Sequence, residues 1–341
     1  MKILTTTLIA FGLLITTLSA QPPKKPLAKK LLPIIDMHLH AYRANAQGPP
    51  PIAICTPFPY WPDRDLRAPS LDYVTTFLKK PVCKNPLWSP MTDQELMTQS
   101  LDILERRNIV AVASGDLEVV EKWKQSKPDR IIPALEFNVK AGMPVEKLRQ
   151  WVKEGKIAVF GEMGDQYGGV TPDDPAYEPY LALAEELDIP IGIHIGPGPP
   201  GVAYFGPETK NYRARMHSPL SLEEPLMRHP KLRVYVMHAG WPMIDDMVAM
   251  LYAHPQLYVD VGIIVYAFPR AEFYRYLQRL VEAGFGKRIM FGSDQMIWPQ
   301  AIEKAIESIE AAPFLSAEQK RDIFYNNAAR FLRLNKGGKI N

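Results

Sequence analysis

"LLPIIDMHLH", residues 31–40, decides the fold, because an apolar run here ends in regularly spaced polar residues. Asp36, His38 and His40 lie two positions apart, and side chains at that spacing on a strand point to the same side. A mostly apolar run of this length is typical of a strand buried on both faces of a parallel sheet. The stretch therefore predicts a buried strand that directs two imidazoles at one point, with Asp36 one step deeper, where it could orient one of them.

Seven further apolar runs, bounded by Gly, Pro or Asn, predict more strands of this kind. Together with 34–38, the predicted strands span 109–113, 131–135, 157–161, 190–195, 232–237, 257–261 and 289–292. Helical patterns alternate with them, at 92–108, 144–154, 175–188, 242–253, 271–284 and 300–311. The first of these helices opens with a capping box formed by Thr92 and Glu95.

This alternation predicts an α/β fold, and the number of units favours a (β/α)8 TIM barrel. An open doubly wound sheet is the alternative, but it would normally carry a glycine-rich phosphate turn after its first strand, where this chain has His-Ala-Tyr-Arg. Two long connections, 41–91 and 196–217, follow the first and fifth strands. Their interleaved aromatic residues favour lids or pocket walls at the carboxyl ends of the strands over disordered decoration.

The chain begins with a segment that resembles a secretory signal peptide. Residues 1–20 combine Lys2, an apolar stretch and a small-residue end at Ser19-Ala20. A membrane anchor is the alternative, but the apolar segment contains five threonines and is short for a span. We therefore expect an exported protein, periplasmic or secreted, without a stable membrane anchor, in which a linker (21–33) precedes the barrel (34–334) and a short tail (335–341) ends the chain.

The composition excludes some partners. A formal net charge of +3, without a long basic run, gives no indication of nucleic-acid binding, so we expect a small-molecule substrate and allow for a homo-oligomer. The two cysteines, Cys55 and Cys83, lie in the same long connection, and the sequence leaves open whether they pair or stay free. No Cys-x-x-Cys is present, which excludes a structural zinc finger.

Polar residues end several of the predicted strands. His38 and His40 end the first, and Glu162, His194, His238 and Asp294 end or follow the fourth, fifth, sixth and eighth. Because parallel strands of a barrel present their carboxyl ends on one face, these side chains should converge there. Imidazoles and carboxylates suit zinc or a similar divalent ion, so the pattern predicts a metal site, although a lone histidine in an apolar run is often only a hydrogen-bonded core residue.

Other residues near these strand ends are weaker candidates. His217 lies in the long loop after the fifth strand and could touch the substrate. In the same loop Arg213 and Arg215 could grip a carboxylate, or form a solvated basic loop. Trp241 and Trp298 could form an apolar wall of the pocket, with core packing as the equal alternative.

The ordered motifs resemble those of the metal-dependent amidohydrolase superfamily, in its amidohydrolase-related branch (family 2). "DMHLH", "GEMG", "GIHIG", "VMHAG", "FGSD" and "NNAARFLRL" carry this resemblance over most of residues 34–334. The resemblance implies a (β/α)8 barrel and the metal ligands His38, His40, His194 and Asp294, with His238 as a further ligand or a proton-transfer residue. Glu162 stands where binuclear members place a bridging carboxylate, so one or two ions are possible, and the closer branch favours one; zinc is favoured over manganese or another ion.

The implied activity is hydrolysis of an amide, lactone or other ester bond of a small molecule by metal-activated water. Asp294 would accept the proton of that water, and His238 would polarise the carbonyl. A metal-dependent decarboxylase of an aromatic or related acid is the alternative, because this branch also contains such lyases. A non-catalytic exported binding protein is a third possibility, whereas a serine hydrolase is disfavoured by the absence of a Gly-x-Ser-x-Gly motif.

Overall fold

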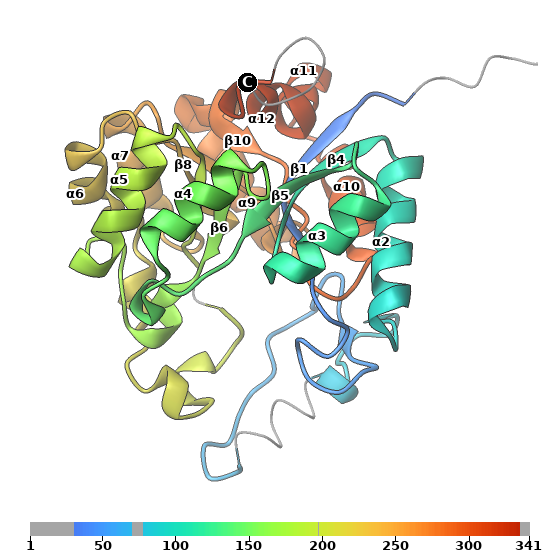
Figure 1. Cartoon of the computed structure of the whole chain (residues 1–341). Coiled ribbons are helices and arrows are strands. Elements are labelled where there is room, and N and C mark those ends of the chain that lie inside the picture. Colours follow the sequence, from blue (N-terminus) through green and yellow to red (C-terminus); the bar gives the residue numbers. More distant parts are fainter. Residues whose placement is uncertain (1–30, 70–77, 197, 335–341) are drawn as a thin grey trace, which may run out of the picture. The chain divides into compact units, whose positions relative to one another are not determined.

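The structure of the chain is a computed structural model that describes residues 31–69, 78–196 and 198–334 (Figure 1). The predicted signal peptide, most of the predicted linker and all of the predicted tail lie outside the described residues. The chain divides into two units, Met1–Leu31 and Leu32–Asn341, and the second contains every element described below. Among the described residues, no helix has both the length and the hydrophobicity needed to cross a membrane.

Eight parallel strands form the sheet in the order β1-β4-β5-β6-β7-β8-β9-β10. They are β1 (Ile34–His40), β4 (Ile109–Ser114), β5 (Ile131–Leu135), β6 (Val159–Met163), β7 (Ile191–His194), β8 (Val234–Met237), β9 (Tyr258–Asp260) and β10 (Ile289–Met290). Between the first and last strands, the Met37 amide donates to the Phe291 carbonyl at 2.9 Å. This contact brings the two edges together, and the predicted (β/α)8 barrel is confirmed.

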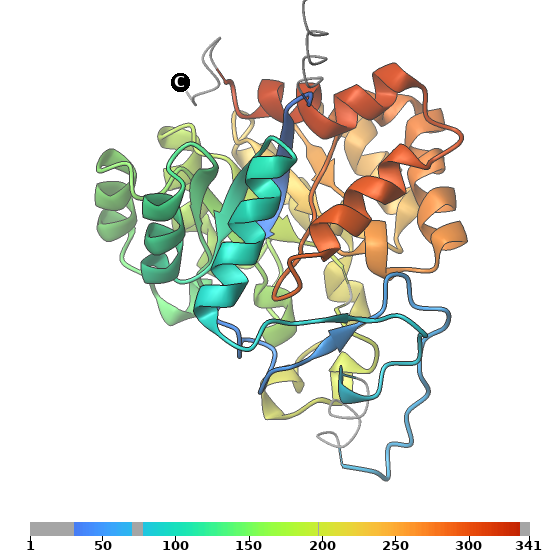
Figure 2. The same ribbon diagram turned by 90° about the vertical axis from the view of Figure 1, so that its right-hand side faces the viewer.

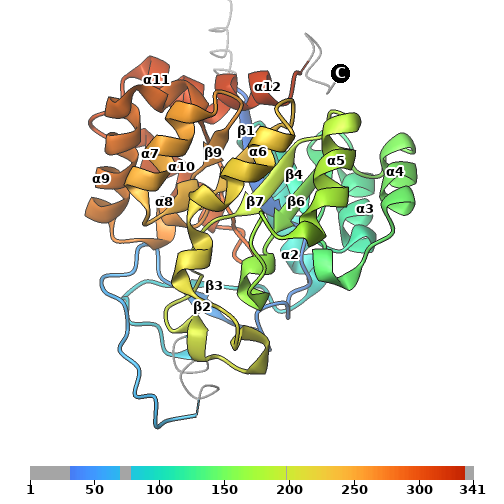
Figure 3. The ribbon, with the colours of Figure 1, turned by 90° about the vertical axis from the view of Figure 1, so that its left-hand side faces the viewer.

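Helices lie around the barrel (Figures 2 and 3). They are α2 (Asp93–Arg106), α3 (Leu117–Ser126), α4 (Val145–Lys153), α5 (Glu178–Glu186), α6 (Glu223–Arg228), α7 (Ile244–Ala253), α8 (Ile264–Ala267), α9 (Arg270–Leu280), α10 (Ala301–Glu310), α11 (Ala317–Arg321) and α12 (Asn327–Phe331). The predicted capping box is confirmed, since the Thr92 hydroxyl accepts from the Glu95 amide at 3.2 Å. Helix α3 was not among the predicted helices; it buries Val119, Val120 and Trp123.

The two long loops lie together at the end of the barrel where the strands finish (Figures 1 and 3). The first contains a two-stranded antiparallel sheet, β2 (Ala53–Ile54) with β3 (Leu87–Trp88), and a disulfide between Cys55 and Cys83. The Arg64 guanidinium donates to the Tyr204 carbonyl at 3.2 Å, which joins the first loop to the second. These loops therefore cover the face on which the predicted site residues lie.

Candidate metal centre

All six predicted ligands come together at the carboxyl ends of the strands. His38 and His40 lie at the end of β1, Glu162 lies in β6 and His194 ends β7; His238 directly follows β8, and Asp294 follows β10. The histidines and Asp294 are buried, and the Glu162 side chain is 13% exposed. The chain thus gathers four imidazoles and two carboxylates at one buried place.

One group of ligand atoms consists of His38, His40 and Asp294. The two Nε2 atoms lie 3.2 Å apart, and Asp294 Oδ1 lies 3.1 Å from that of His40 and 3.8 Å from that of His38. Asp294 Oδ1 is buried and has no hydrogen-bond donor. A buried carboxylate oxygen without a donor is costly unless a cation or a proton donor completes its surroundings. The two Nε2 atoms and Asp294 Oδ1 therefore suit the binding of a divalent ion.

Asp260 fixes the proton of the His38 ring. Its Oδ2 lies 3.2 Å from His38 Nδ1, and its Oδ1 accepts from the Gly262 amide at 2.8 Å and the His238 amide at 3.2 Å. A carboxylate accepts the Nδ1 proton, which leaves the Nε2 lone pair free for a metal. Asp260 was not predicted from the sequence, although it ends the apolar run of β9 as the other candidates end theirs.

A second group consists of His194, His238 and Glu162. His238 Nε2 lies 2.9 Å from His194 Nδ1, and Glu162 Oε1 contacts both rings, at 3.4 Å from that of His238. The other ring nitrogens each face a backbone carbonyl: His194 Nε2 lies 2.8 Å from the Gly196 oxygen, and His238 Nδ1 lies 3.1 Å from the Gly262 oxygen. A carbonyl only accepts, so these two nitrogens can hold the ring protons when the inward nitrogens bind an ion.

Glu162 joins the two groups. Its Oε1 faces the second group, while its Oε2 lies 3.2 Å from His40 Nε2 and 3.4 Å from His38 Nε2. Each oxygen of one carboxylate thus faces a different pair of imidazoles. The geometry suits either a single ion held mainly by one group or two ions with Glu162 between them.

Charge within the site shifts the pKa values strongly. Burial alone would lower the pKa of the His40 ring, but the Asp294 and Glu162 carboxylates outweigh it and raise that pKa to about 9. Burial would raise the pKa of Glu162, yet the neighbouring imidazoles, His194 foremost, hold it well below its usual value. Burial and then the charge of His238 lower the pKa of His194. In the protein without metal, protons therefore occupy part of the ligand set.

The backbone at two of the ligands is unusual. His238 has φ 60° and Asp294 has φ 50°, and such left-handed values are uncommon outside glycine. The Asp294 amide donates to the His38 carbonyl at 2.6 Å, and the Tyr266 hydroxyl donates to the Asp294 carbonyl at 2.8 Å. These bonds hold Asp294 in its strained conformation, with its carboxylate toward His38 and His40.

A family model described as Amidohydrolase (Amidohydro_2) matches residues 35–334, which is most of the chain. The chain belongs to this amidohydrolase family. The family is metal-dependent and acts on small molecules, in agreement with the donor set described above. The predicted membership is confirmed, and the protein is an enzyme of a family that includes both hydrolases and decarboxylases.

Individual relatives are distant. The amidohydrolase is 27% identical over 282 residues to a γ-resorcylate decarboxylase of Rhodococcus jostii (strain RHA1), covering 69% of this chain and 80% of that protein. An uncharacterised TIM-barrel protein of Bordetella bronchiseptica superposes with a TM-score of 0.56 at 18% identity, over 89% of this chain and 99% of its own. A probable 2-pyrone-4,6-dicarboxylic acid hydrolase of Acinetobacter baumannii gives 0.56 at 16%, over 88% and 99%. These structures share the TIM-barrel fold of this amidohydrolase.

The four predicted substrate-binding residues lie outside the metal centre. Arg213 donates to the carbonyls of Lys210, at 3.1 Å, and Tyr212, at 2.6 Å, and Arg215 is exposed. Trp241 is half-buried against Phe268, with ring centroids 4.4 Å apart, and its indole N–H donates to Glu272. A substrate role for these three residues stays a prediction.

Trp298, the fourth of these residues, is buried, and its indole N–H donates to the Ile52 carbonyl at 2.9 Å, so it ties the first long loop to the barrel. Asp36 also acts on the backbone: its Oδ1 accepts from the amides of His38, at 3.0 Å, and Ser293, at 2.9 Å. The carboxylate that contacts the His38 ring is therefore that of Asp260, and not that of Asp36 as the sequence suggested.

Tyr42 and Glu136 at the mouth of the barrel were not predicted. The Tyr42 ring stacks on His40 with centroids 4.3 Å apart, and its hydroxyl donates to Glu136 at 2.8 Å. Glu136 directly follows β5 and is exposed. Its position after an apolar strand is the same signal that identified Glu162, whereas nothing in the sequence connects it to Tyr42.

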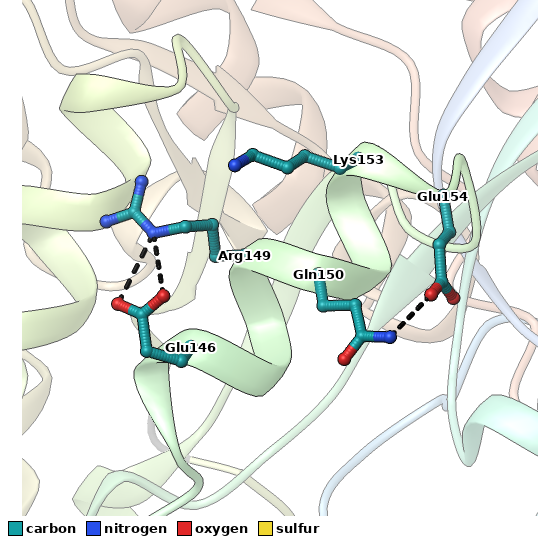
Figure 4. Close-up of a pocket in the computed structure, with 5 residues that line it drawn as sticks. All are labelled: Glu146, Arg149, Gln150, Lys153 and Glu154. Atoms are coloured by element: carbon teal, nitrogen blue, oxygen red, sulfur yellow. Dashed lines mark hydrogen bonds and ion pairs between the residues drawn. The ribbon is translucent and has the colours of Figure 1, made fainter.

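A depression on the outer surface has a different character (Figure 4). Its lining residues all belong to α4 or its C-cap: Glu146, Arg149, Gln150, Lys153 and Glu154. Arg149 pairs there with Glu146, and also with Glu186 of α5. Solvated ion pairs of this kind are common on helix surfaces, so we assign no function to this depression.

Proposed function

We propose that this amidohydrolase is a hydrolase that cleaves an amide, lactone or other ester bond of a small molecule. The observation that carries the proposal is the position of Glu162, whose two carboxylate oxygens each face a separate pair of imidazoles. Asp294 Oδ1, buried and without a donor, lies beside the first pair. Together these groups support a hydrolytic metal centre.

We further propose that the centre holds two divalent ions with Glu162 between them. His38, His40 and Asp294 would hold one ion. The second would be held by His194 and His238, whose outer ring nitrogens face backbone carbonyls that can hold the ring protons. Zinc suits imidazole and carboxylate ligands, and manganese is the alternative. This count differs from the single ion that the closer branch resemblance favoured.

Asp294 and His238 would have different roles in the proposed reaction. Bound divalent ions would lower the pKa of water toward neutrality and polarise a carbonyl group. The Asp294 carboxylate, which lies beside His38 and His40, can accept the proton of the attacking water and deliver it to the leaving group. Because His238 Nδ1–H is committed to the Gly262 carbonyl, its Nε2 is better placed as a ligand than as a proton donor.

Decarboxylation is the second candidate, and the 27% identity to a γ-resorcylate decarboxylase favours it. The centre would then hold the substrate carboxylate, and Asp294 would protonate the carbon that loses carbon dioxide. Arg213 gives this reading little support, because its guanidinium is bound to two backbone carbonyls of its own loop. Hydrolysis therefore remains the first choice.

The Cys55–Cys83 disulfide supports the proposal that the protein is exported. Disulfides persist in oxidising compartments and are rare in the cytosol. Together with the N-terminal sequence, this bond favours a periplasmic or secreted protein over a cytosolic one. Alkylation of free thiols in protein isolated from its native compartment would test this, and two reactive thiols per chain would contradict it.

A substrate panel decides between the two reactions. Protein loaded with zinc or manganese would be incubated with lactones, aryl esters and amides in one series, and with hydroxybenzoates in another. We expect hydrolysis in the first series and no carbon dioxide release in the second. Carbon dioxide release without hydrolysis would overturn the hydrolase proposal. An Asp294→Asn variant that still holds metal serves as the control and should be inactive in both series.

A further inference from the structure

Gln295 joins the end of the first strand to the segment that follows the last strand. Its side chain is fully buried, and its amide makes two hydrogen bonds with the backbone of His40. Oε1 accepts from the His40 amide at 2.9 Å, and Nε2 donates to the His40 carbonyl at 2.6 Å. Nε2 also donates to the Met296 carbonyl at 3.2 Å. Both N–H groups of this buried amide therefore have an acceptor, and its oxygen has a donor.

This side chain continues the contact between the two edges of the barrel. The Asp294 amide donates to the His38 carbonyl at 2.6 Å, which is a contact between two backbones. Two positions further along β1, the backbone of His40 meets the Gln295 side chain instead. A primary amide offers the same kinds of donor and acceptor as a peptide group, so Gln295 takes the place of a strand residue at this point.

The backbone around Gln295 explains why a side chain makes this contact. Asp294, which precedes Gln295, has φ 50°, and Met296, which follows it, has φ 46°. Both values lie in the left-handed region, where a strand cannot continue. The chain therefore turns away from β1, while the Gln295 side chain extends back to it.

The residues that Gln295 connects are candidate ligands of the same ion. His40 and Asp294 belong with His38 to the first group of ligand atoms, and Asp294 Oδ1 lies 3.1 Å from His40 Nε2. Both bonds of Gln295 act on the His40 backbone, so they fix where this backbone lies relative to that of Asp294. Without them, a buried amide and a buried carbonyl would lose their partners, and a shift of the strand end would change the distances between the ligand atoms.

The ring of His40 has other supports. The Ser114 hydroxyl lies 3.2 Å from His40 Nδ1, and the Tyr42 ring stacks on the imidazole with centroids 4.3 Å apart. These contacts act on the orientation of the ring, whereas Gln295 acts on the backbone that carries it. Loss of the Gln295 amide should therefore move His40 as a whole.

We propose that Gln295 is a positioning residue: it holds the His40 backbone beside the Asp294 segment and so sets the spacing of the ligands of one ion. This inference rests on the proposed metal centre, in which His38, His40 and Asp294 hold that ion. Gln295 acts through His40 and is not itself proposed as a ligand.

The test compares Gln295→Met with Asn327→Leu in the full chain. Methionine keeps the length of the glutamine side chain and removes its amide. Asn327 is the matched control, because its amide is also fully buried and donates to two backbone carbonyls at the start of β10, those of Gly286, at 2.9 Å, and Ile289, at 2.7 Å. Gln295→Asn, whose amide is on a side chain too short to keep both bonds, is a second variant in case methionine prevents folding.

Three quantities are measured for each protein. They are the thermal unfolding of metal-free protein, the zinc dissociation constants by competition with a chelator, and the visible absorption spectrum of the cobalt(II)-loaded protein, which depends on the arrangement of the ligands. We expect both substitutions of Gln295 to weaken zinc binding at one site by about ten- to a hundredfold, the usual effect of losing a partner that orients a ligand, and to alter the cobalt spectrum. Asn327→Leu should lower thermal stability and leave the zinc affinity and the spectrum unchanged.

The outcomes separate this inference from the proposed centre. If wild type binds zinc and the Gln295 variants bind it equally tightly with an unchanged cobalt spectrum, the inference fails and the centre stands. An equal loss of affinity in Asn327→Leu would also overturn the inference, since general destabilisation would then account for the effect. If wild type binds neither zinc nor cobalt, the proposed centre itself is refuted, and the inference with it.

Discussion

Replacing Asp260 with asparagine should place the ring proton of His38 on Nε2, the atom that is proposed to bind the metal. Asp260 Oδ1 is held by the amides of Gly262, at 2.8 Å, and His238, at 3.2 Å, so the oxygen of an asparagine would take this place. The new NH2 group would then lie where Oδ2 is now, 3.2 Å from His38 Nδ1. Because an NH2 group donates, His38 would keep its proton on Nε2, the atom that faces the ion.

The expected loss of zinc affinity follows from this change in the His38 ring. Loss of a hydrogen-bonded partner of a metal-binding histidine usually weakens metal affinity by about ten- to a hundredfold. At about 1.4 kcal/mol for each factor of ten, the Asp260→Asn variant should bind its first ion about 1.4–2.7 kcal/mol more weakly. The similar size of the two side chains and the complete burial of Asp260 argue against a new cavity as the cause.

The assay is a titration of metal-free protein with zinc against a chromophoric chelator, with thermal unfolding of the metal-free variants as a check on folding. Asp36→Asn is the matched control, since Asp36 is equally buried and accepts from the amides of His38 and Ser293 rather than from an imidazole. It should bind zinc as wild type does. Unchanged affinity in Asp260→Asn, or an equal loss in Asp36→Asn, would refute the assigned tautomer of His38.

Three further predictions concern the proton load, the disulfide and the reaction. The zinc affinity of metal-free protein, measured by the same titration, should rise from pH 6.5 to about 9 and then level off. The reason is that the pKa of His40 is raised to about 9, so that below this pH a proton must leave before the metal binds. An affinity that does not change with pH would contradict this. Replacing both Cys55 and Cys83 by serine, which opens a loop with a sequence separation of 28, should lower the free energy of unfolding by about 3–4 kcal/mol in chemical denaturation, with the metal content unchanged. Asp294→Asn should lower turnover by about a hundred- to ten-thousandfold when metal content is matched, and unchanged turnover would exclude Asp294 as the proton-transfer group.

The barrel and the convergence of the six candidate ligands could be predicted because they depend on local patterns. Apolar runs mark strands that are buried on both faces, and a polar residue at the end of such a run must lie at the face where the strands finish. His38, His194 and Asp294 were recognised in this way. Helix α3 was not, although Val119, Val120 and Trp123 form its apolar side.

Pairings between distant segments could not be predicted in the same way. Asp260 meets His38 across 222 positions of the chain, and Trp298 meets Ile52 across 246. The pairing of Cys55 with Cys83 likewise depends on how the first long loop folds. The surroundings of a ring nitrogen depend on single backbone groups, such as the Gly262 carbonyl beside His238 Nδ1, which no pattern of residue types specifies.

The metal content of the purified protein tests the central claim most directly. Elemental analysis of wild type and of a Glu162→Gln variant, after dialysis against the same zinc-buffered solution, would give the number of ions per chain. We predict two ions in wild type and no more than one tightly bound ion in the variant, because one carboxylate faces both groups of imidazoles. One ion in both proteins would contradict the two-ion centre and leave Glu162 as a neighbour of the site.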